Sequence, residues 1–358
     1  MAVYDSGTGE VLLDMIRPIA SRLQPRPIVA APRAVITARD IFERAGIVHD
    51  LDRVEALLLE RTASRSPFIA AAGTHTIRAG GKRLRAALVL LVGKLSDYSI
   101  ERSIHPAASA ELIHAASLVH DDLVDQADQR RGVATVHSSW NNDVALLLGD
   151  YFFALAAGEM ALSPDPRIIT FYAQAVQTIV EGELNPVMVV EPFDLAVSQY
   201  IYKIGCKTAA LFEASCKAGI AAAGGSDAQI EALGRFGYDL GVAFQIVDDV
   251  LDFVGDERTL GKPAGNDLRQ GTITLPLIHA IANGGGEFLH HAASGIALSD
   301  NDVARAVAEV VEQAGVELAR TDAISYAERA VAHLDQFPYT PALRALRDLA
   351  RFVVERQA

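Results

Sequence analysis

Residues 111–125 read Glu111-Leu-Ile-His-Ala-Ala-Ser-Leu-Val-His-Asp-Asp-Leu-Val-Asp125, an apolar segment that ends in carboxylates and is followed by Arg130-Arg131-Gly132. In a helix, Asp121 and Asp125 are one turn apart and about 40° offset around the axis, with Asp122 beside them. Like charges at this spacing repel each other unless a cation neutralises them. Carboxylate oxygens at helical spacing suit a hard divalent ion such as Mg²⁺.

A second copy of this pattern argues against the alternative of a solvated acidic helix face. Phe244-Gln-Ile-Val-Asp-Asp-Val-Leu-Asp252 has the same apolar lead-in and the same spacing of Asp248, Asp249 and Asp252. Two such helices that face each other would form a metal clamp around a polyanion. The sequence therefore predicts a metal site with six candidate ligands: Asp121, Asp122, Asp125, Asp248, Asp249 and Asp252.

Basic residues occur at the places where a diphosphate would need them. They occur in the segments Gly80-Gly-Lys-Arg-Leu-Arg85, Arg130-Arg131 and Lys207-Thr208, and at Lys262. Arginine and lysine are the usual partners of phosphate oxygens. Taken singly, each motif has a structural explanation: a helix start with surface bases, a core histidine at His114, or a lysine that snorkels at position 207.

Together, these motifs make residues 49–358 resemble the trans-type polyprenyl diphosphate synthases, with five motifs in the family's order. The resemblance implies binding of isopentenyl diphosphate and of an allylic prenyl diphosphate, with two or three Mg²⁺ ions per active site. For isopentenyl diphosphate it implies Lys82, Arg85, His114 and Arg131. For the allylic diphosphate it implies Arg130, Lys207, Thr208, Gln245 and Lys262.

Three positions depart from the family pattern. Ala86 stands where the family commonly has proline, Pro186 where it usually has glutamine, and Thr272 where it often has lysine. A proline at position 186 is expected to end or kink the helix that contains it. With threonine at position 272, the chain lacks one positive charge that the family often has there.

Composition predicts an all-α protein that is long enough to bury a large core. Half of the 358 residues are hydrophobic, only 6% are aromatic, and alternating β-branched runs are hard to find. We expect a single-domain helical bundle over residues 49–358, of the isoprenoid-synthase type by resemblance, with a central active-site cavity. Residues 1–48 are an N-terminal extension, in which scattered acidic residues argue against a transit peptide.

Net charge, cysteine content and hydropathy limit the possible partners and the cellular compartment of the protein. The net charge of −13 argues against a nucleic-acid partner. Cys206 and Cys216 suggest neither a disulfide framework nor a metal site, so a cytoplasmic location is the simplest. No apolar run is expected to reach the length of a membrane span. The resemblance implies a homodimer.

The length of the product depends on the face of the first aspartate helix. Ala116, Ile113 and Ala110 lie five, eight and eleven residues before Asp121, on one predicted helix face. In the family, a large aromatic residue at the first of these positions stops chain growth early. Ala116 is small, so we expect a medium- or long-chain product. The alternatives are a short-chain (farnesyl or geranylgeranyl) synthase, a terpene cyclase, or a non-catalytic subunit of a two-subunit synthase.

Overall fold

The computed structural model describes residues 37–130, 132–254, 264–296 and 298–356. The first half of the described chain contains α2 (Ala38–Arg44), α3 (Val48–Arg61), α4 (Pro67–Arg78), α5 (Leu84–Gly93), α6 (Ile100–Val124), β1 (Gln129–Arg130), β2 (Val133–Ala134), α7 (Val136–Ser139), α8 (Asn142–Ala161) and α9 (Arg167–Glu183). The second half contains α10 (Phe193–Ile204), the π-helix η1 (Gly205–Ala209), α11 (Ala210–Ala222), α12 (Asp227–Val254), α14 (Asn266–Arg269), α15 (Leu275–Ala282), α16 (Glu287–Ala292), α17 (Asp300–Glu312), α18 (Gly315–Ala332) and α19 (Pro341–Glu355). The all-α prediction is confirmed, apart from the two-residue strands β1 and β2, which form an antiparallel hairpin.

Side-chain caps set the starts of several helices. The side chain of Asn141 accepts a hydrogen bond from the Val144 N–H (2.8 Å) at the start of α8, and Thr340 does the same for Leu343 (3.0 Å) at α19. Such caps satisfy N–H groups that have no partner within the helix. At α2, Thr37 and Asp40 form a reciprocal capping box. This helix lies within the stretch assigned to the N-terminal extension, yet its Ile41 and Phe42 are buried in the main core.

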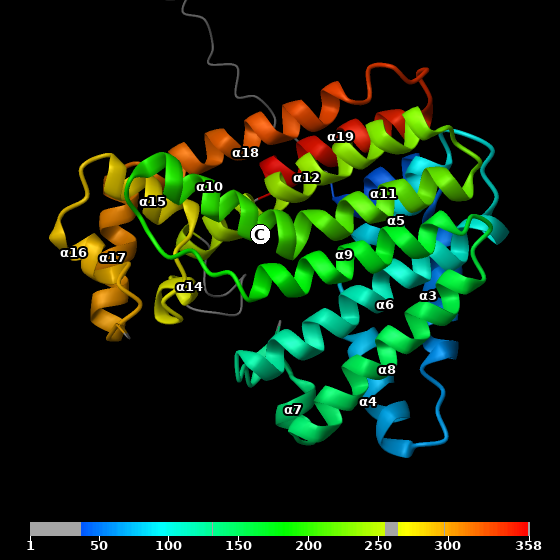
Figure 1. The fold of residues 1–358 in the computed structure, drawn as a ribbon, viewed down its shortest axis with the longest axis horizontal. Helices are drawn as coiled ribbons and strands as arrows, with labels where there is room; N and C mark the ends of the chain where they lie inside the picture. Colours follow the sequence, from blue (N-terminus) through cyan, green and yellow to red (C-terminus); the bar gives the residue numbers. More distant parts are fainter. Residues whose placement is uncertain (1–36, 131, 255–263, 297, 357–358) are drawn as a thin grey trace, which may run out of the picture. The chain divides into compact units, whose positions relative to one another are not determined.

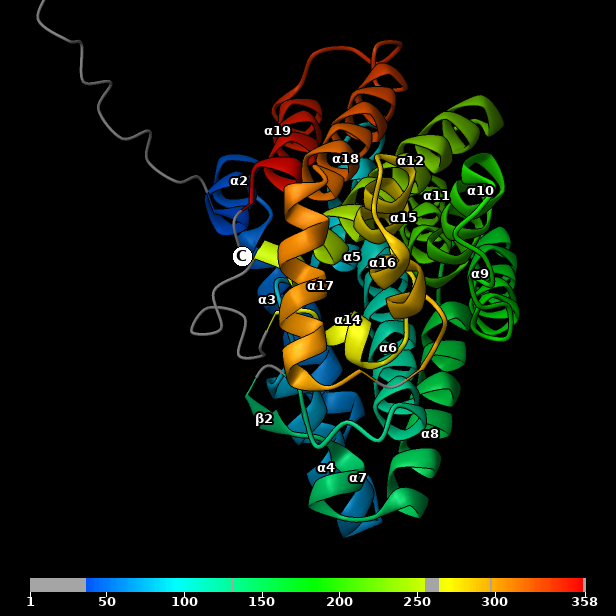
Figure 2. The ribbon, with the colours of Figure 1, turned by 90° about the vertical axis from the view of Figure 1, so that its left-hand side faces the viewer.

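The helix α5 is at the centre of the bundle, because every residue from Ala86 to Gly93 is buried. It packs against α6 and α11, and α6 in turn packs against α8 (Figure 1). Gly219 permits the close approach of α11, since a Cβ there would lie 2.4 Å from the Val89 carbonyl oxygen of α5. Figure 2 shows α8 and α9 on the outer, right-hand side of these helices. A second apolar core joins the C-terminal half of α12 to α15, α17 and α18.

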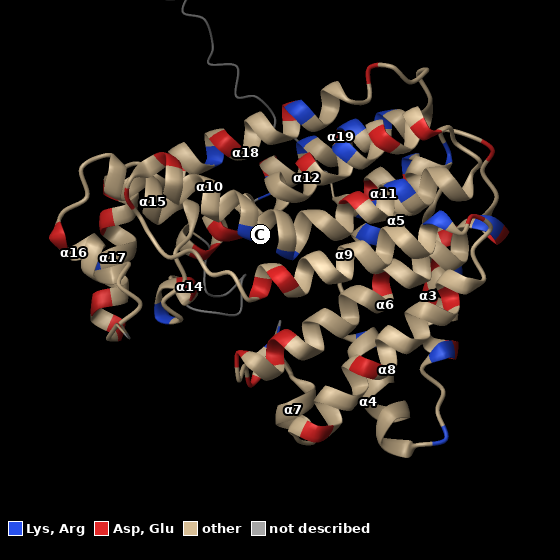
Figure 3. Ribbon diagram, in the orientation of Figure 1, with Lys and Arg blue, Asp and Glu red and all other residues tan. Residues whose placement is uncertain are grey.

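Both aspartate motifs lie at the C-terminal ends of long helices, α6 and α12. Figure 3 shows acidic residues gathered where α6 and α9 end. The acidic ends of α6 and α12 line one cavity. This arrangement confirms the predicted bundle with a central cavity.

The expectation that no apolar stretch reaches the length of a membrane span is wrong for α8. By length and composition alone, this helix of 20 residues, whose most apolar stretch has a mean hydropathy of 1.5, could cross a membrane. Part of its apolar surface packs against α6, and 39% of that stretch is buried inside the protein. The remainder includes the exposed side chains of Leu146 and Leu147.

Candidate active site

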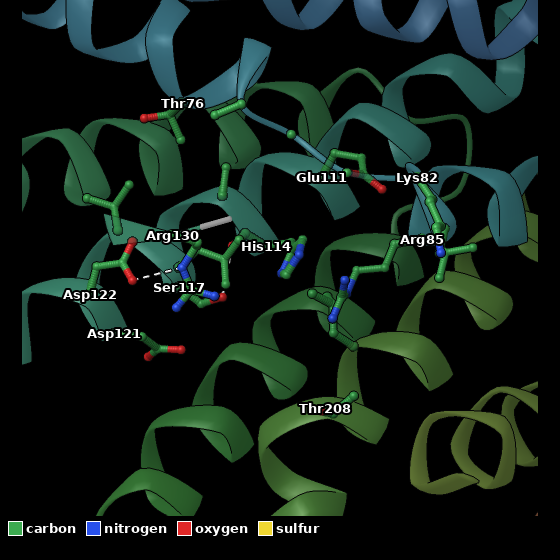
Figure 4. Close-up of a pocket in the computed structure, with 18 of the residues that line it drawn as sticks. Thr76, Lys82, Arg85, Glu111, His114, Ser117, Asp121, Asp122, Arg130 and Thr208 are labelled. Carbon is green, nitrogen blue, oxygen red and sulfur yellow. Dashed lines mark hydrogen bonds and ion pairs between the residues drawn. The ribbon is translucent and has the colours of Figure 1, made fainter. Parts of the chain in front are cut away.

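The main cavity has a volume of about 720 Å³ and brings the two aspartate motifs together. Asp121, Asp122 and Asp125 line it from the end of α6, and Asp248 and Gln245 line it from α12. The sequence motifs are therefore neighbours in space, although more than a hundred residues separate them. Figure 4 shows Asp121, Asp122 and Arg130 on one side of this cavity, Lys82 and Arg85 on the other, and His114 between the two groups.

The three aspartates of the α12 motif have different environments. Asp248 lines the cavity, and its side chain is 41% exposed. Asp249 is buried, and its two oxygens accept hydrogen bonds from Tyr200 Oη (2.6 Å) and Gln245 Nε2 (2.8 Å). Asp252 accepts hydrogen bonds from the backbone N–H groups of Asn266 (3.2 Å) and Asp267 (3.0 Å). It therefore holds the start of α14 against α12.

Ion pairs neutralise several of the acidic groups at the cavity. Arg130 Nε lies 2.8 Å from Asp122 Oδ1, and Arg356 Nη2 lies 2.6 Å from Asp248 Oδ1. Lys207 Nζ lies 2.9 Å from Glu183 and 3.9 Å from Asp121. Across the described part of the chain, no three Asp, Glu, His or Cys side chains converge closely enough to hold a metal ion without rearrangement.

The electrostatics of the cavity favour an added cation. Burial raises the pKa of Asp121 to about 6, and the nearby Lys207 only partly offsets this effect. Burial also raises the pKa of Asp249 to about 7. Burial acts to lower the pKa of Lys207, but Asp121 and Glu183 together outweigh it, so this pKa is raised. A desolvated carboxylate such as Asp121 gains most from a divalent ion.

The π-helix η1 turns Lys207 and Thr208 towards the cavity. π-Bulges occur mostly as single turns within α-helices, and often at functional sites. Within this turn, Gly205 leaves room for Tyr238, since a Cβ there would lie 2.5 Å from the tyrosine oxygen. The chain therefore has a widened turn between α10 and α11, at the position of Lys207 and Thr208.

Lys82, in the loop before α5, and Arg85, in the first turn of α5, line the opposite wall of the cavity. The ammonium of Lys82 lies 5.3 Å from the ring centre of Phe352, and the guanidinium of Arg85 lies 5.0 Å from that of Phe212. Arg83, between them, has a left-handed backbone (φ 50°) and donates to the Ile77 carbonyl oxygen at 2.6 Å. Its side chain is directed into the protein and organises the loop.

Glu111 connects this loop to α6. Its carboxylate is 4% exposed, accepts the Ala86 N–H at 3.0 Å and lies 3.7 Å from Arg83 Nη1. It therefore fixes the first turn of α5, and with it the position of Arg85. No separate signal in the sequence marks this role, because Glu111 stands ten residues before Asp121 in an otherwise apolar segment.

We expect Glu111→Ala to lower the free energy of unfolding by about 3 kcal/mol, because it leaves the Arg83 guanidinium, whose side chain is only 13% exposed, without this partner. Glu111→Gln keeps an acceptor for the Ala86 N–H and should cost about 1 kcal/mol. Urea denaturation measures both values. Glu55→Ala is the matched control, because Glu55 is an exposed partner of Arg83 at 3.6 Å and should contribute less than about 1 kcal/mol. Equal losses for Glu111→Ala and Glu55→Ala would contradict this role.

The structure places most, but not all, of the predicted site residues around the cavity. His114, Arg130, Lys207, Thr208 and Gln245 line it. Arg131 and Lys262 lie outside the described residues. Pro186 follows the end of α9 at Glu183, and the Thr272 N–H donates to the Asp267 carbonyl oxygen at 2.8 Å.

The predicted chain-length residues are part of the core. Ala116, Ile113 and Ala110 are at most 1% exposed, and none of them lines the main cavity. Their neighbours on α6 do, namely Ala115, Ser117 and Leu118, together with the apolar Ile179 and Leu211. The apolar part of the cavity therefore starts beside the predicted face of α6.

Two charged residues at the site were not predicted from the sequence. Glu183 pairs with Lys207, and Arg356 pairs with Asp248. The Arg356 side chain is only 9% exposed, and its guanidinium lies 4.1 Å from the ring centre of Phe244. Glu183 ends α9, three residues before the departure from the family pattern at Pro186, and Arg356 follows α19, the last helix of the described residues.

Comparisons with known proteins agree with this geometry. A family model described as polyprenyl synthetase matches residues 66–313. Heptaprenyl diphosphate synthase component 2 of Geobacillus stearothermophilus is 39% identical over 323 residues, which cover 86% of this chain and 96% of that protein. Octaprenyl diphosphate synthase of Escherichia coli K12 is 34% identical over 309 residues, which cover 86% of this chain and 96% of that protein. A polyprenyl synthase from Caulobacter crescentus CB15, solved with calcium and isoprenyl diphosphate, has a TM-score of 0.85 and 36% identity, and the match covers 91% of this chain and all of that one.

Proposed function

The chain belongs to the polyprenyl synthetase family and is a prenyltransferase; from this premise we propose that it joins isopentenyl diphosphate head-to-tail to an allylic diphosphate, making a medium- or long-chain trans-polyprenyl diphosphate. The observation that carries the proposal is the single cavity lined by both aspartate motifs and by bases on two sides. A second set of bases is what a reaction of two diphosphates requires. A terpene cyclase, which ionises one diphosphate, has no use for it.

The donor set of the cavity fits divalent metal ions. Asp121, Asp125 and Asp248 offer only carboxylate oxygens, which are hard ligands, and Asp121 is desolvated. We propose that these three residues hold two or three Mg²⁺ ions, with the present ion pair between Asp248 and Arg356 opening as they bind. Bound ions would neutralise the charge on the diphosphate that leaves.

The protein side chains would hold the two substrates in different parts of the cavity. We assign Arg130 and Lys207, which line the cavity, to the allylic diphosphate, and we add Lys262 by resemblance alone. We assign Lys82, Arg85 and His114, which also line it, to isopentenyl diphosphate, and we add Arg131 by resemblance alone. Because these groups come from different elements of the chain, namely β1 and η1 for the one set and the start of α5 with α6 for the other, each diphosphate would have its own place and the reacting carbon atoms would be held close together.

The reaction breaks the C1–O bond of the allylic diphosphate and forms a carbon–carbon bond to the double bond of isopentenyl diphosphate. Positive charge develops on the allylic carbon as pyrophosphate leaves. The amide of Gln245 and the backbone carbonyl groups near Lys207 and Thr208 stabilise this charge without forming a covalent adduct. One proton is then lost, for which the departing pyrophosphate is the acceptor. The product is an allylic diphosphate that can react again.

Incubation of the purified chain with Mg²⁺, farnesyl diphosphate and isopentenyl diphosphate tests this function. Chromatography of the dephosphorylated lipids should show products beyond geranylgeranyl length. Products that stop at that length would indicate a short-chain synthase, and a cyclised hydrocarbon formed without isopentenyl diphosphate would indicate a cyclase. No product from the chain alone would indicate a subunit that needs a partner. The name of the Geobacillus relative, "component 2", makes this outcome a specific alternative.

We also propose that the chain is a homodimer that uses the outer faces of α8 and α9. Exposed apolar side chains follow one another on these helices and just beyond the end of α9: Leu146, Leu147, Ile169, Val180 and Leu184 are each at least 44% exposed. A second copy of the chain would cover them.

The cytoplasm is the compartment we propose, and the two free, buried cysteines Cys206 and Cys216 support it.

The dimer predicts that Leu147→Glu gives a monomer at micromolar concentration, because a buried carboxylate without a partner is costly in an interface. Light scattering coupled to size-exclusion chromatography measures the mass. The matched control is Ile324→Glu, which changes an apolar residue of α18 that is 42% exposed and should leave the dimer intact. A wild-type monomer would contradict the dimer, and a dimeric Leu147→Glu variant would contradict the proposed face.

A further inference from the structure

A chain of four side chains runs from the wall of the cavity into the protein interior. Thr208 Oγ1 donates to Gln245 Oε1 (2.6 Å), Gln245 Nε2 donates to Asp249 Oδ1 (2.8 Å), and Tyr200 Oη donates to Asp249 Oδ2 (2.6 Å). The chain connects η1, α12 and α10.

Only the first half of this chain faces the cavity. Thr208 and Gln245 line it, whereas Asp249 and Tyr200 do not. Asp249 is 6% exposed and Tyr200 is 1% exposed. Asp249 and Tyr200 can therefore affect the reaction only through the residues in front of them. Both oxygens of Asp249 already accept hydrogen bonds from side chains, while the adjacent Asp248 lines the cavity.

The hydrogen-bond chemistry selects one orientation of the Gln245 amide. A side-chain amide has an acceptor end and a donor end, and a hydroxyl such as that of Thr208 can serve either end. Both oxygens of Asp249 accept hydrogen bonds from side chains, so Asp249 is the partner that decides which end of the amide faces which neighbour. Tyr200 donates to the other carboxylate oxygen and holds Asp249 in this position.

We propose that Tyr200 is a positioning residue of the allylic site, which acts through Asp249 to keep the carbonyl oxygen of Gln245 beside Thr208 at the cavity wall. The inference rests on the proposed function, because there the amide oxygen stabilises the positive charge that develops on the allylic carbon. In this assignment Asp249 is a positioning residue as well. Of the three aspartates in the α12 motif, only Asp248 would then bind a metal ion.

Tyr200→Phe is the main test, because it removes only the hydroxyl. We expect kcat to fall about tenfold, the effect of one lost buried hydrogen bond on the transition state, with KM for both diphosphates unchanged. Tyr172→Phe is the matched control. Tyr172 is similarly buried, and its hydroxyl donates to the Pro106 carbonyl oxygen (2.8 Å) away from the cavity. This variant should lose comparable stability and keep its kcat within about twofold of the wild type.

A double-mutant cycle separates positioning from a general structural effect. In a Gln245→Leu background, Tyr200→Phe should change kcat by less than about twofold, because the group through which it acts is gone. The same tenfold loss in both backgrounds would overturn the proposal. So would an undiminished kcat for Tyr200→Phe, or an equal loss for Tyr172→Phe.

Asp249→Asn supplies a second measurement, which also serves if Tyr200→Phe does not fold. We expect its kcat to fall about tenfold while the Mg²⁺ concentration for half-maximal rate stays unchanged. A rise of tenfold or more in that concentration would return Asp249 to the metal ligands and overturn the assignment. If the wild-type protein forms no prenyl product at all, the proposed function fails and this inference fails with it. Wild-type activity combined with a normal Tyr200→Phe variant refutes this inference alone.

Discussion

Asp121→Asn lowers kcat for prenyl transfer by about a thousandfold or more, because it removes a metal ligand and a charge that acts on the departing diphosphate. The variant keeps the size and shape of the side chain, and Lys207 keeps its closer partner Glu183 at 2.9 Å. Steady-state kinetics at matched Mg²⁺ concentrations measure the loss. Asp143→Asn, at an exposed position near the start of α8, is the control and should retain wild-type activity.

The same substitution should not destabilise the metal-free protein. Burial raises the pKa of Asp121 to about 6, above its ordinary value of 3.8. Above pH 6 the ionised carboxylate therefore disfavours the folded state, and a neutral asparagine removes this cost. We expect a melting temperature equal to or above that of the wild type at pH 7.5. A variant that folds and turns over at the wild-type rate would refute the assignment of Asp121.

Ala116→Tyr shifts the products to farnesyl or geranylgeranyl diphosphate, because a large ring on this face of α6 would block the path of the growing chain. Ala116 is fully buried in the structure, so the added ring must displace its neighbours at a cost of about 1–3 kcal/mol. Chromatography of the dephosphorylated products measures their length. Release of pyrophosphate from a short allylic primer serves as the control that ionisation continues.

Ser117→Phe asks the same question from the adjacent position, which lines the cavity. It is the variant of choice if Ala116→Tyr does not fold. We expect shorter products here too, because the ring would occupy the start of the apolar part of the cavity. Unchanged product lengths in both variants would show that the chain does not grow along this part of α6.

The fold was predictable from the sequence because its signals are local. Apolar residues at helical spacing, few aromatics and two Asp-rich helix ends indicate a helical bundle, and the bundle has those helices. The pairing of α6 with α12 around one cavity also followed from the sequence. Two apolar helices that both end in carboxylates are each costly to bury alone, and a shared cation between them removes that cost.

The details of the site depend on contacts that the sequence does not encode locally. Asp248 and Asp249 are adjacent and chemically identical, but they differ by about 100° around α12. One therefore lines the cavity and the other is buried against Tyr200. The rotation of a helix within a bundle is set by its packing, which a motif does not reveal.

Arg356 illustrates the same limit on prediction. It lies 108 positions after its partner Asp248 and reaches the site only because α19 packs beside α12 and α5. Nothing in the neighbouring sequence distinguishes it from the arginines within α19. Likewise, the depth of Ala116 in the core depends on its neighbours outside α6.

Diffraction from crystals grown with Mn²⁺ and an unreactive allylic diphosphate analogue tests the central claim, that α6 and α12 hold divalent ions jointly around a diphosphate. We predict anomalous peaks at about 2.0–2.6 Å from oxygens of Asp121 and Asp125 on one side and of Asp248 on the other, with Arg356 displaced from Asp248. Peaks at only one of the two helices, or at Asp249 and Asp252 instead of Asp248, would contradict it.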